Sequence, residues 1–460
     1  MAERPPEKRK VTGSTPVPTT KVAQARGSLG ETAAVRRIIA WIARFASYLL
    51  FRRVEVAGME RYPTGRPVLL VANHFNGFVD PVLIATVLGR LPRFIAKGGL
   101  RKIPILGLVL RSAGVVFVHR REDKDGAESN EDAFADCHRA LAARDVVAIF
   151  PEGTTHDRAQ IDPIKTGAAR IALGARSAGA TELAIVPVGL TFPDKVALRS
   201  SALVEFGVPI DLDVAAPGAA ADDADAVRQL TTLIDRGIRS VSPDFPDIET
   251  ALALDQAAQI ALSSRDDPDP SLETRANLAR RLGRTTVDDQ AAVRRDVGRY
   301  LTTLAGLRLT DTDVIQPTNP TRLLRSAFWI AVLVILLGGL VAATLLINLW
   351  PALLVVLVSL FVKTPVSKGT ARVLVGLIAF PVAWIVGGVL AADGALAVTL
   401  VVITAGAGAL AAIWMVERSI ALVYMLLRWQ GQRERIGTVV LAESVRADVV
   451  TTVHSVVGPS

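Results

Sequence analysis

The sequence predicts an α/β domain, followed by an α-helical region and C-terminal transmembrane helices. Between residues 52 and 212, short runs rich in β-branched residues alternate with helical stretches, a pattern typical of an α/β domain with a largely buried sheet. The expected strands are VEVAG, PVLLVAN, RFIAK, GVVFVHR, VVAIF, LAIVPVGL and ALVEFG. Long uncharged runs in the last third of the chain have the length of membrane-spanning helices.

The composition agrees with a membrane protein. Half of the 460 residues are hydrophobic and only 21% are charged, whereas soluble proteins carry about a quarter charged residues. The net charge of +8 suits an anionic membrane surface, an acidic small substrate or nucleic acid, and does not choose between them. The single cysteine, Cys137, excludes an internal disulfide framework, and the five histidines show no zinc-ligand spacing.

Two segments precede the α/β domain. Residues 1–30 are rich in Pro, Thr, Lys and Arg, without the apolar run of a signal peptide, and predict a disordered basic tail. Residues 31–51 have apolar side chains at intervals of three and four, which predicts an amphipathic helix with Arg36, Arg37 and Arg44 on its polar face. Such a helix lies in the headgroup layer of a bilayer or covers the core of the next domain. Both interpretations stay open.

The remaining segments are assigned by composition. Residues 213–319 predict several short helices of a soluble region, and residues 320–428 predict a membrane region. Within it, 373–392 and 394–416 each suit one span. Residues 326–362 carry no charge and would form a helix of about 55 Å, so we expect a bend at Asn348 and Pro351 that gives a hairpin or two short spans. Residues 429–460 predict a cytoplasmic tail.

The first chemical motif is NHFNGFVDP, which directly follows an apolar strand. His74 and Asp80 would be about 240° out of phase on a continuous helix, but a turn at Asn76-Gly77 can fold them together. A carboxylate that holds one imidazole nitrogen leaves the other free to act as a base. Asp80 before Pro81 is also what a plain helix N-cap would look like.

Three further motifs each end or form an expected strand. GVVFVHR delivers Arg120 to the sheet edge, where it could bind phosphate or belong to a solvated charge run. FPEGTTHD presents Glu152 and Gly153 in a loop that could contact a ligand or form an ordinary β-turn. IVPVGL is a buried strand that contains Pro187.

These four blocks, in this order, resemble the glycerophospholipid acyltransferase family, which includes the glycerol-3-phosphate and 1-acylglycerol-3-phosphate acyltransferases. The resemblance extends from about residue 52 to 209 and includes AK at 96–97 and PIKTGAARIAL at 163–173. Five residues separate His74 from Asp80 where most members have four, which is similar to the branch of the fungal glycerol-3-phosphate and dihydroxyacetone-phosphate acyltransferases. Thr155 stands where the family usually has Arg.

The resemblance implies the fold of a glycerol-3-phosphate acyltransferase-like domain and a role for each matching residue. His74 would be the general base, and Asp80 would orient it. No acyl-enzyme is needed, so Cys137 has no required role. The acceptor's phosphate would be held by Arg120, Glu152 and Gly153, with Lys97 or Lys165 replacing the missing arginine, and Pro187 would shape the acyl site.

The expected reaction moves a fatty acyl group from an acyl thioester to a hydroxyl of glycerol 3-phosphate or 1-acylglycerol 3-phosphate, in phosphatidic acid synthesis. Acyl-CoA or acyl-carrier protein would be the co-substrate, with no other cofactor and no metal. The alternatives are a lysophospholipid or other lipid acyltransferase, and a non-catalytic lipid-binding membrane protein. The expected partners are the bilayer, the donor and the acceptor, and not nucleic acid.

The basic residues around the apolar segments predict the topology. By the positive-inside rule, the catalytic domain lies on the cytoplasmic face of the membrane, the chain crosses an even number of times, and the turn at Asp393 lies outside. The high content of Ala and Arg with few Lys residues suggests a bacterial protein, and on that basis we expect the plasma membrane.

Overall fold

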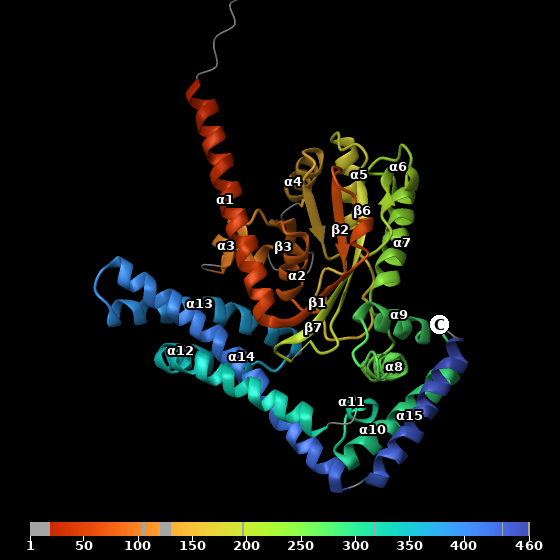
Figure 1. Cartoon of the computed structure of the whole chain (residues 1–460). Helices are drawn as coiled ribbons and strands as arrows, with labels where there is room; N and C mark the ends of the chain where they lie inside the picture. Colours follow the sequence, from red (N-terminus) through yellow and green to blue (C-terminus); the bar gives the residue numbers. More distant parts are fainter. Residues whose placement is uncertain are drawn as a thin grey trace, which may run out of the picture.

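A computed structural model describes residues 19–103, 106–119, 130–195, 197–316, 319–434 and 436–458. Figure 1 shows the strands gathered in one sheet, with long helices extending from it toward both ends of the chain. Of the tail expected over 1–30, the first 18 residues lie outside the described part. The helix α1 (Thr19–Leu50) begins well before residue 31, within the range where the composition predicted disorder.

The sheet contains all seven expected strands and one short strand more. Its order is β1-β7-β6-β2-β5-β3-β4, with β8 paired to β6. All the other pairings are parallel, but β6 runs antiparallel to β7 and to β8. The strands are β1 (Phe51–Ala57), β2 (Val68–Ala72), β3 (Arg93–Lys97), β4 (Val116–Val118), β5 (Val146–Ile149), β6 (Ala184–Thr191), β7 (Ser200–Phe206) and β8 (Ile210–Asp211).

Helices cover both faces of this sheet, which is why β2 is buried along its whole length. On one face, α1 and α2 (Val79–Leu88) share a core with alternate strand residues. The opposite face is covered by α4 (Glu131–Ala142), α5 (Gly167–Ser177), α6 (Leu212–Ala215) and α7 (Ala224–Val241). Short elements link these layers: η1 (Met59–Arg61), η2 (Gly98–Lys102) and α3 (Leu106–Ser112).

The α/β domain extends beyond the boundary expected at residue 212. Helix α7 packs against β6 and buries Val227, Leu230, Ile234 and Ile238. These residues repeat at helical spacing, so the periodicity was visible in the sequence. What the sequence does not show is that the apolar face of α7 covers the sheet and not the helical region that follows.

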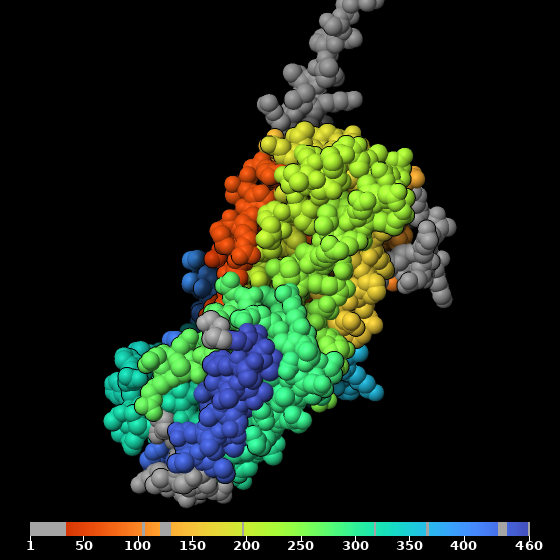
Figure 2. All heavy atoms as spheres, turned by 90° about the vertical axis from the view of Figure 1, so that its right-hand side faces the viewer, coloured from red at the N-terminus to blue at the C-terminus, as the bar shows by residue number. Residues whose placement is uncertain are grey.

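The helical region forms a separate core from α8 (Ile248–Leu262), α9 (Leu272–Leu282), α10 (Val287–Leu307) and α11 (Asp311–Ile315). Side chains of Asp247, Ser271 and Thr286 accept backbone N–H groups and define where three of these helices begin. The expected tail over 429–460 instead contains α15 (Ile436–Val457), whose Ala442, Val449 and Val453 are buried in that core. Figure 2 shows α15 in blue, seated against α10 in green.

Three long apolar helices complete the described chain: α12 (Pro320–Phe361), α13 (Pro365–Ala391) and α14 (Ala395–Glu434). Each is long and apolar enough to cross a membrane. The hairpin expected over 326–362 is wrong, because α12 stays helical through Pro351. Asn348, the other residue that suggested a break, forms hydrogen bonds to both neighbouring helices. Its side-chain amide donates to the Ala405 carbonyl of α14 and accepts from the Trp384 indole of α13, both at 2.9 Å.

Candidate active site

A histidine and an aspartate meet where β2 ends. The Nδ1 atom of His74 lies 2.8 Å from Oδ2 of Asp80. The intervening chain turns at Gly77, which has a positive φ of 52°, and the Val79 N–H donates to the Asn76 carbonyl at 3.0 Å. Glycine adopts this left-handed backbone without the steric cost of a Cβ. The expected turn is confirmed, and it brings the two side chains together.

Asp80 is not a helix cap. Helix α2 begins at Val79, and Asp80 lies within its first turn. Its buried Oδ2 also accepts the Asn76 N–H at 2.8 Å. An ionised carboxylate can only accept, so this contact favours the tautomer with the proton on Nδ1, which leaves Nε2 able to accept a proton. The His74 side chain is 19% exposed and Asp80 is fully buried, which leaves the imidazole edge accessible to a substrate.

Glu152 holds the backbone on which His74 sits. Its Oε1 accepts the His74 N–H at 2.8 Å, and its Oε2 accepts from Nε2 of His156 at 2.8 Å and from the Asp162 N–H at 2.9 Å. The carboxylate is fully buried. Both oxygens are therefore occupied, and Glu152 fixes the position of the His74 backbone. The role in holding the acceptor's phosphate that the resemblance implies for Glu152 stays a prediction.

The same carboxylate belongs to a group with metal-ligand chemistry. One donor atom each of Glu152, His156 and Asp162 lies within 4.8 Å of the others. The hydrogen bonds from His156 and from the Asp162 backbone to Glu152 account for this proximity. These contacts tie the FPEGTTHD loop to His74.

Aromatic stacking fixes the plane of the imidazole. The ring of Phe150 stacks on His74 with centroids 4.0 Å apart and an interplanar angle of 14°. Phe94 stacks in turn near Phe150, at 6.3 Å. Phe150 directly precedes the Pro-Glu-Gly loop, so a single short segment both stacks on the imidazole and holds its backbone.

Asn73 anchors the end of β2 to the neighbouring strand β6. Its Nδ2 donates to the Leu190 carbonyl at 3.0 Å, and its Oδ1 accepts the Leu190 N–H at 2.7 Å. The side chain is fully buried, so these two bonds replace a strand pairing just before His74. Sequence reasoning missed this role, and the one available signal was that Asn73 is next to the histidine.

Two of the expected cations lie at the same edge of the sheet. Lys165 donates its backbone N–H to the Pro151 carbonyl at 3.0 Å. A Cβ on Gly153, whose φ is +72°, would lie only 3.0 Å from the Lys165 ammonium nitrogen, so the charge borders the Glu152–Gly153 loop. Lys97 ends β3, and parallel strands bring it to the edge where His74 leaves β2. Arg120 lies outside the described residues.

Pro187 and Cys137 are both buried within the domain. Pro187 lies within β6, where a Cβ on Gly237 of α7 would come within 2.6 Å of its ring, so it packs inside the domain, and its role at an acyl site stays a prediction. Cys137 is fully buried on α4. Burial, with the nearby Asp136 charge, raises the pKa of Cys137 to about 12. A neutral buried thiol is a poor nucleophile.

The N-terminal part of α13 touches the histidine motif from almost 300 residues away. The Phe78 N–H donates to Oγ1 of Thr370 at 3.1 Å. A Cβ on Gly369 would lie 3.0 Å from Oδ1 of Asn76, so the glycine permits this close approach. No local sequence signal predicts the contact, because it depends on how an apolar helix docks against the α/β domain.

An acyltransferase family model matches residues 53–191. That range contains both members of the His74–Asp80 pair, the Glu152 loop and the cations Lys97 and Lys165. Residues 53–191 form an acyltransferase domain. The resemblance predicted from the four blocks is therefore confirmed, as are the α/β fold of this domain and the helical remainder of the chain.

Curated relatives align with the acyltransferase domain. Glycerol-3-phosphate O-acyltransferase 2 of Saccharomyces cerevisiae is 35% identical over 28% of this chain and 18% of its own length. Lyso-ornithine lipid O-acyltransferase of Brucella abortus is 34% identical over 34% of this chain and 56% of its own. Human 1-acyl-sn-glycerol-3-phosphate acyltransferase beta is 30% identical over 35% and 54%. The chain thus spans between 18% and 56% of the length of these relatives.

A solved structure also aligns with the acyltransferase domain. It is the crystal structure of the 1-acyl-sn-glycerophosphate acyltransferase PlsC from Thermotoga maritima, with a TM-score of 0.32 and 23% identity over 43% of this chain and 77% of that chain.

Proposed function

We propose that this protein is a membrane-bound O-acyltransferase that moves a fatty acyl group from an acyl thioester to a hydroxyl of glycerol 3-phosphate or 1-acylglycerol 3-phosphate. The observation that carries the proposal is the 2.8 Å contact between Nδ1 of His74 and Asp80, at the sheet edge where open α/β folds bind ligands. The contact prepares the partly exposed imidazole to accept a proton at Nε2.

The chemistry follows from that protonation state. Nε2 of His74 takes the acceptor's hydroxyl proton as the oxygen attacks the thioester carbonyl, and Asp80 stabilises the resulting imidazolium. When the tetrahedral intermediate collapses, the new C–O ester bond remains, the C–S bond breaks, and the leaving sulfur receives the proton from His74. No acyl-enzyme is formed, which agrees with the buried, protonated state of Cys137.

Cations beside the loop would bind the acceptor's phosphate. Lys165 borders Gly153, and Lys97 ends the neighbouring strand. Thr155 stands where the family usually has arginine and carries no charge. An ammonium group beside the loop would supply the missing positive charge. Arg120 would complete the set, on the evidence of its motif alone.

Acylation of a lysolipid is a second candidate. Thr155 stands in place of the family's arginine, so we expect weaker binding of the acceptor's phosphate. In addition, two curated relatives are lyso-ornithine lipid O-acyltransferases, from Brucella abortus and Rhizobium meliloti. Such an acceptor would use the same His74–Asp80 pair and depend less on Lys165.

The test is release of free thiol from acyl-CoA or acyl-carrier protein by the purified full chain. Each donor is offered with glycerol 3-phosphate, 1-acylglycerol 3-phosphate or lyso-ornithine lipid. We expect thiol release only when an acceptor is present, and fastest with a phosphorylated one. Preference for lyso-ornithine lipid would favour the second candidate, and no release with any pair would favour a lipid-binding protein without catalysis.

We also propose the arrangement in the membrane. The N-terminal part of α13 contacts the histidine motif through Thr370, and Glu417 of α14 pairs with Arg199 of the α/β domain at 2.6 Å. Helix α15 returns to the helical region, where Arg446 pairs with Asp311 at 2.8 Å. These contacts require α12, α13 and α14 to leave and return on one side of the bilayer.

An even number of crossings satisfies this requirement. The α13–α14 pair would cross out and back, with Asp393 on the far side. Helix α12, with 42 residues, would be about 63 Å long. Its uncharged middle packs against α13 and α14 through Asn348, so α12 would lie immersed in the apolar part of the cytoplasmic leaflet without crossing. The basic residues near its ends and in the C-terminal part of α14 then face the cytoplasm, as the positive-inside rule requires, with the active site on the cytoplasmic face of the plasma membrane.

A further inference from the structure

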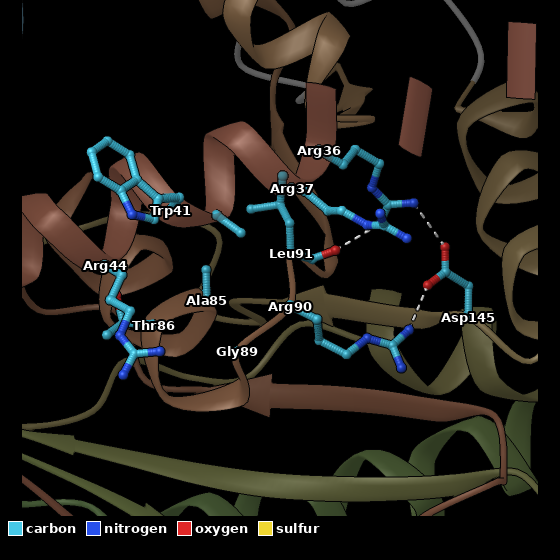
Figure 3. A pocket seen from close by; sticks show the side chains of 11 residues that line it. Arg36, Arg37, Trp41, Arg44, Ala85, Thr86, Gly89, Arg90, Leu91 and Asp145 are labelled. Atoms are coloured by element: carbon cyan, nitrogen blue, oxygen red, sulfur yellow. Dashed lines mark hydrogen bonds and ion pairs between the residues drawn. The ribbon is translucent and has the colours of Figure 1, made fainter. Parts of the chain in front are cut away.

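A basic cavity lies between α1 and the end of α2. It has a volume of about 650 Å³, and four of the residues that line it are arginines. In Figure 3, Arg36 and Arg90 both point toward Asp145, whereas Trp41 and Arg44 lie on the other side of the opening. Arg37 comes from the same stretch of α1.

This cavity is distinct from the active site. Asp145 directly precedes β5, and Arg90 and Leu91 precede β3. They lie at the amino ends of parallel strands, whereas His74 and Glu152 follow the carboxyl ends. Helix α2 connects the two places, since it begins beside Asp80 and ends at Leu88.

The cavity carries an excess of positive charge. Arg36, Arg90 and Arg93 contact Asp145 at 3.3, 2.9 and 3.0 Å. Burial acts to raise the pKa of Asp145, but the Val146 N–H and the charges of Arg36 and Arg93 outweigh it and hold the pKa below its usual value. One ionised carboxylate therefore meets several guanidinium groups.

Two arginines remain available to a ligand. Arg37 and Arg44 are exposed and form no hydrogen bond or ion pair within the described part of the chain. Guanidinium groups bind phosphate oxygens through paired N–H donors. Their separation by seven residues places them on the same side of α1, two turns apart.

An apolar surface borders the cavity. Ile38, Trp41 and Tyr48 of α1 are 58–66% exposed, and Leu108 of α3 is 61% exposed. Helix α3 packs next to α1. Tryptophan and tyrosine concentrate where a membrane meets water, so a ligand here can place a phosphate in the cavity and acyl chains against the apolar surface.

We propose that this cavity binds the phosphate group of an anionic phospholipid, through Arg37 and Arg44 with Arg36 and Arg90 in support. The site would hold α1 at the bilayer surface independently of acyl transfer. Both interpretations of the amphipathic helix then apply to α1, because Ala43 and Ala46 on its other side are buried in the domain core.

The test measures binding of three probes to the purified full-length protein: water-soluble dihexanoyl phosphatidylglycerol, dihexanoyl phosphatidylcholine and inorganic phosphate. We expect phosphatidylglycerol to bind most tightly, and the double variant R37Q/R44Q to bind it at least about tenfold more weakly. The matched control is R228Q/R236Q, which removes two exposed arginines from α7 on the opposite face of the sheet.

Each outcome decides the proposal. Loss of phosphatidylglycerol binding in R37Q/R44Q alone supports it. Equal binding of inorganic phosphate would show that the cavity takes a free anion and overturn the lipid assignment. Equal binding of phosphatidylcholine, or unchanged binding by R37Q/R44Q, would overturn the anionic site.

Discussion

His74 and Asp80 make a 2.8 Å contact although five residues lie between them along the chain. The separation would place them on different sides of a helix, and the Asn76-Gly77 turn removes that difficulty. Asp80 also accepts the Asn76 N–H, so the carboxylate stabilises the turn that brings it to the histidine. A substitution at either residue therefore affects both the orientation of the imidazole and its ability to take up a proton.

His74→Ala should abolish most acyl transfer. A general base contributes about 10²–10⁴-fold in rate, and we expect kcat to fall within that range in the thiol-release assay. Asp80→Asn should lower kcat as well, because an amide cannot stabilise the imidazolium. His454→Ala, which removes an exposed histidine from α15, is the control and should leave kcat unchanged. Near wild-type turnover in His74→Ala would eliminate this mechanism.

Lys165→Ala should weaken acceptor binding more than donor binding. Loss of one charge-assisted contact costs about 1.5–3 kcal/mol, equivalent to a roughly ten- to more than hundredfold rise in the acceptor KM. Arg120→Ala should act in the same direction. Arg170→Ala, an exposed cation on α5, is the control. A shift in the donor KM instead would place Lys165 at the thioester site.

Thr370→Val should lower kcat although Thr370 lies on α13. Valine keeps the shape of threonine but cannot accept the Phe78 N–H, and an unpaired donor costs about 1–2 kcal/mol. We expect a roughly five- to thirtyfold loss. Thr370→Ser restores the acceptor oxygen and should restore the rate. If serine and valine behave alike, the hydroxyl does not position the histidine motif.

Asp145→Asn should destabilise the α/β domain by about 1–3 kcal/mol at neutral pH. The folded state lowers the pKa of Asp145, so its stabilising contribution is present above the unfolded pKa of about 3.9 and is lost as pH falls through the folded value. The gap in Tm between wild type and variant should therefore close below about pH 4. Asp448→Asn, in an exposed pair with Arg299, should show little effect. A gap that persists at low pH would exclude the ionic cause.

The sequence predicted the elements of the acyltransferase domain better than their contacts. All seven strands and the turn at Gly77 follow from local patterns, because strand alternation and glycine's backbone freedom are local properties. The roles of Asn73 and Glu152 depend on hydrogen bonds across the fold, which no short motif contains.

Long-range docking explains the remaining differences. The sequence shows that α13 is apolar and that α15 can be helical. The contact of Thr370 with Phe78 and the burial of Val449 arise only when distant segments meet. Pro351 suggested a break, yet the loss of one backbone hydrogen bond is tolerated where neighbouring helices pack. Burial of Pro187 beneath α7 likewise depends on Gly237.

Cysteine labelling of intact cells tests the proposed topology. Cys137 is fully buried and should not react, so single cysteines can be added at Asp393, Lys363 and Ser455, all exposed. Asp393→Cys should react with a membrane-impermeant thiol reagent, because α13 and α14 cross and return. Lys363→Cys and Ser455→Cys should react only after permeabilisation, which is also the control for accessibility. Labelling of Lys363→Cys in intact cells would mean that α12 crosses the membrane, and labelling of Ser455→Cys would contradict an even number of crossings.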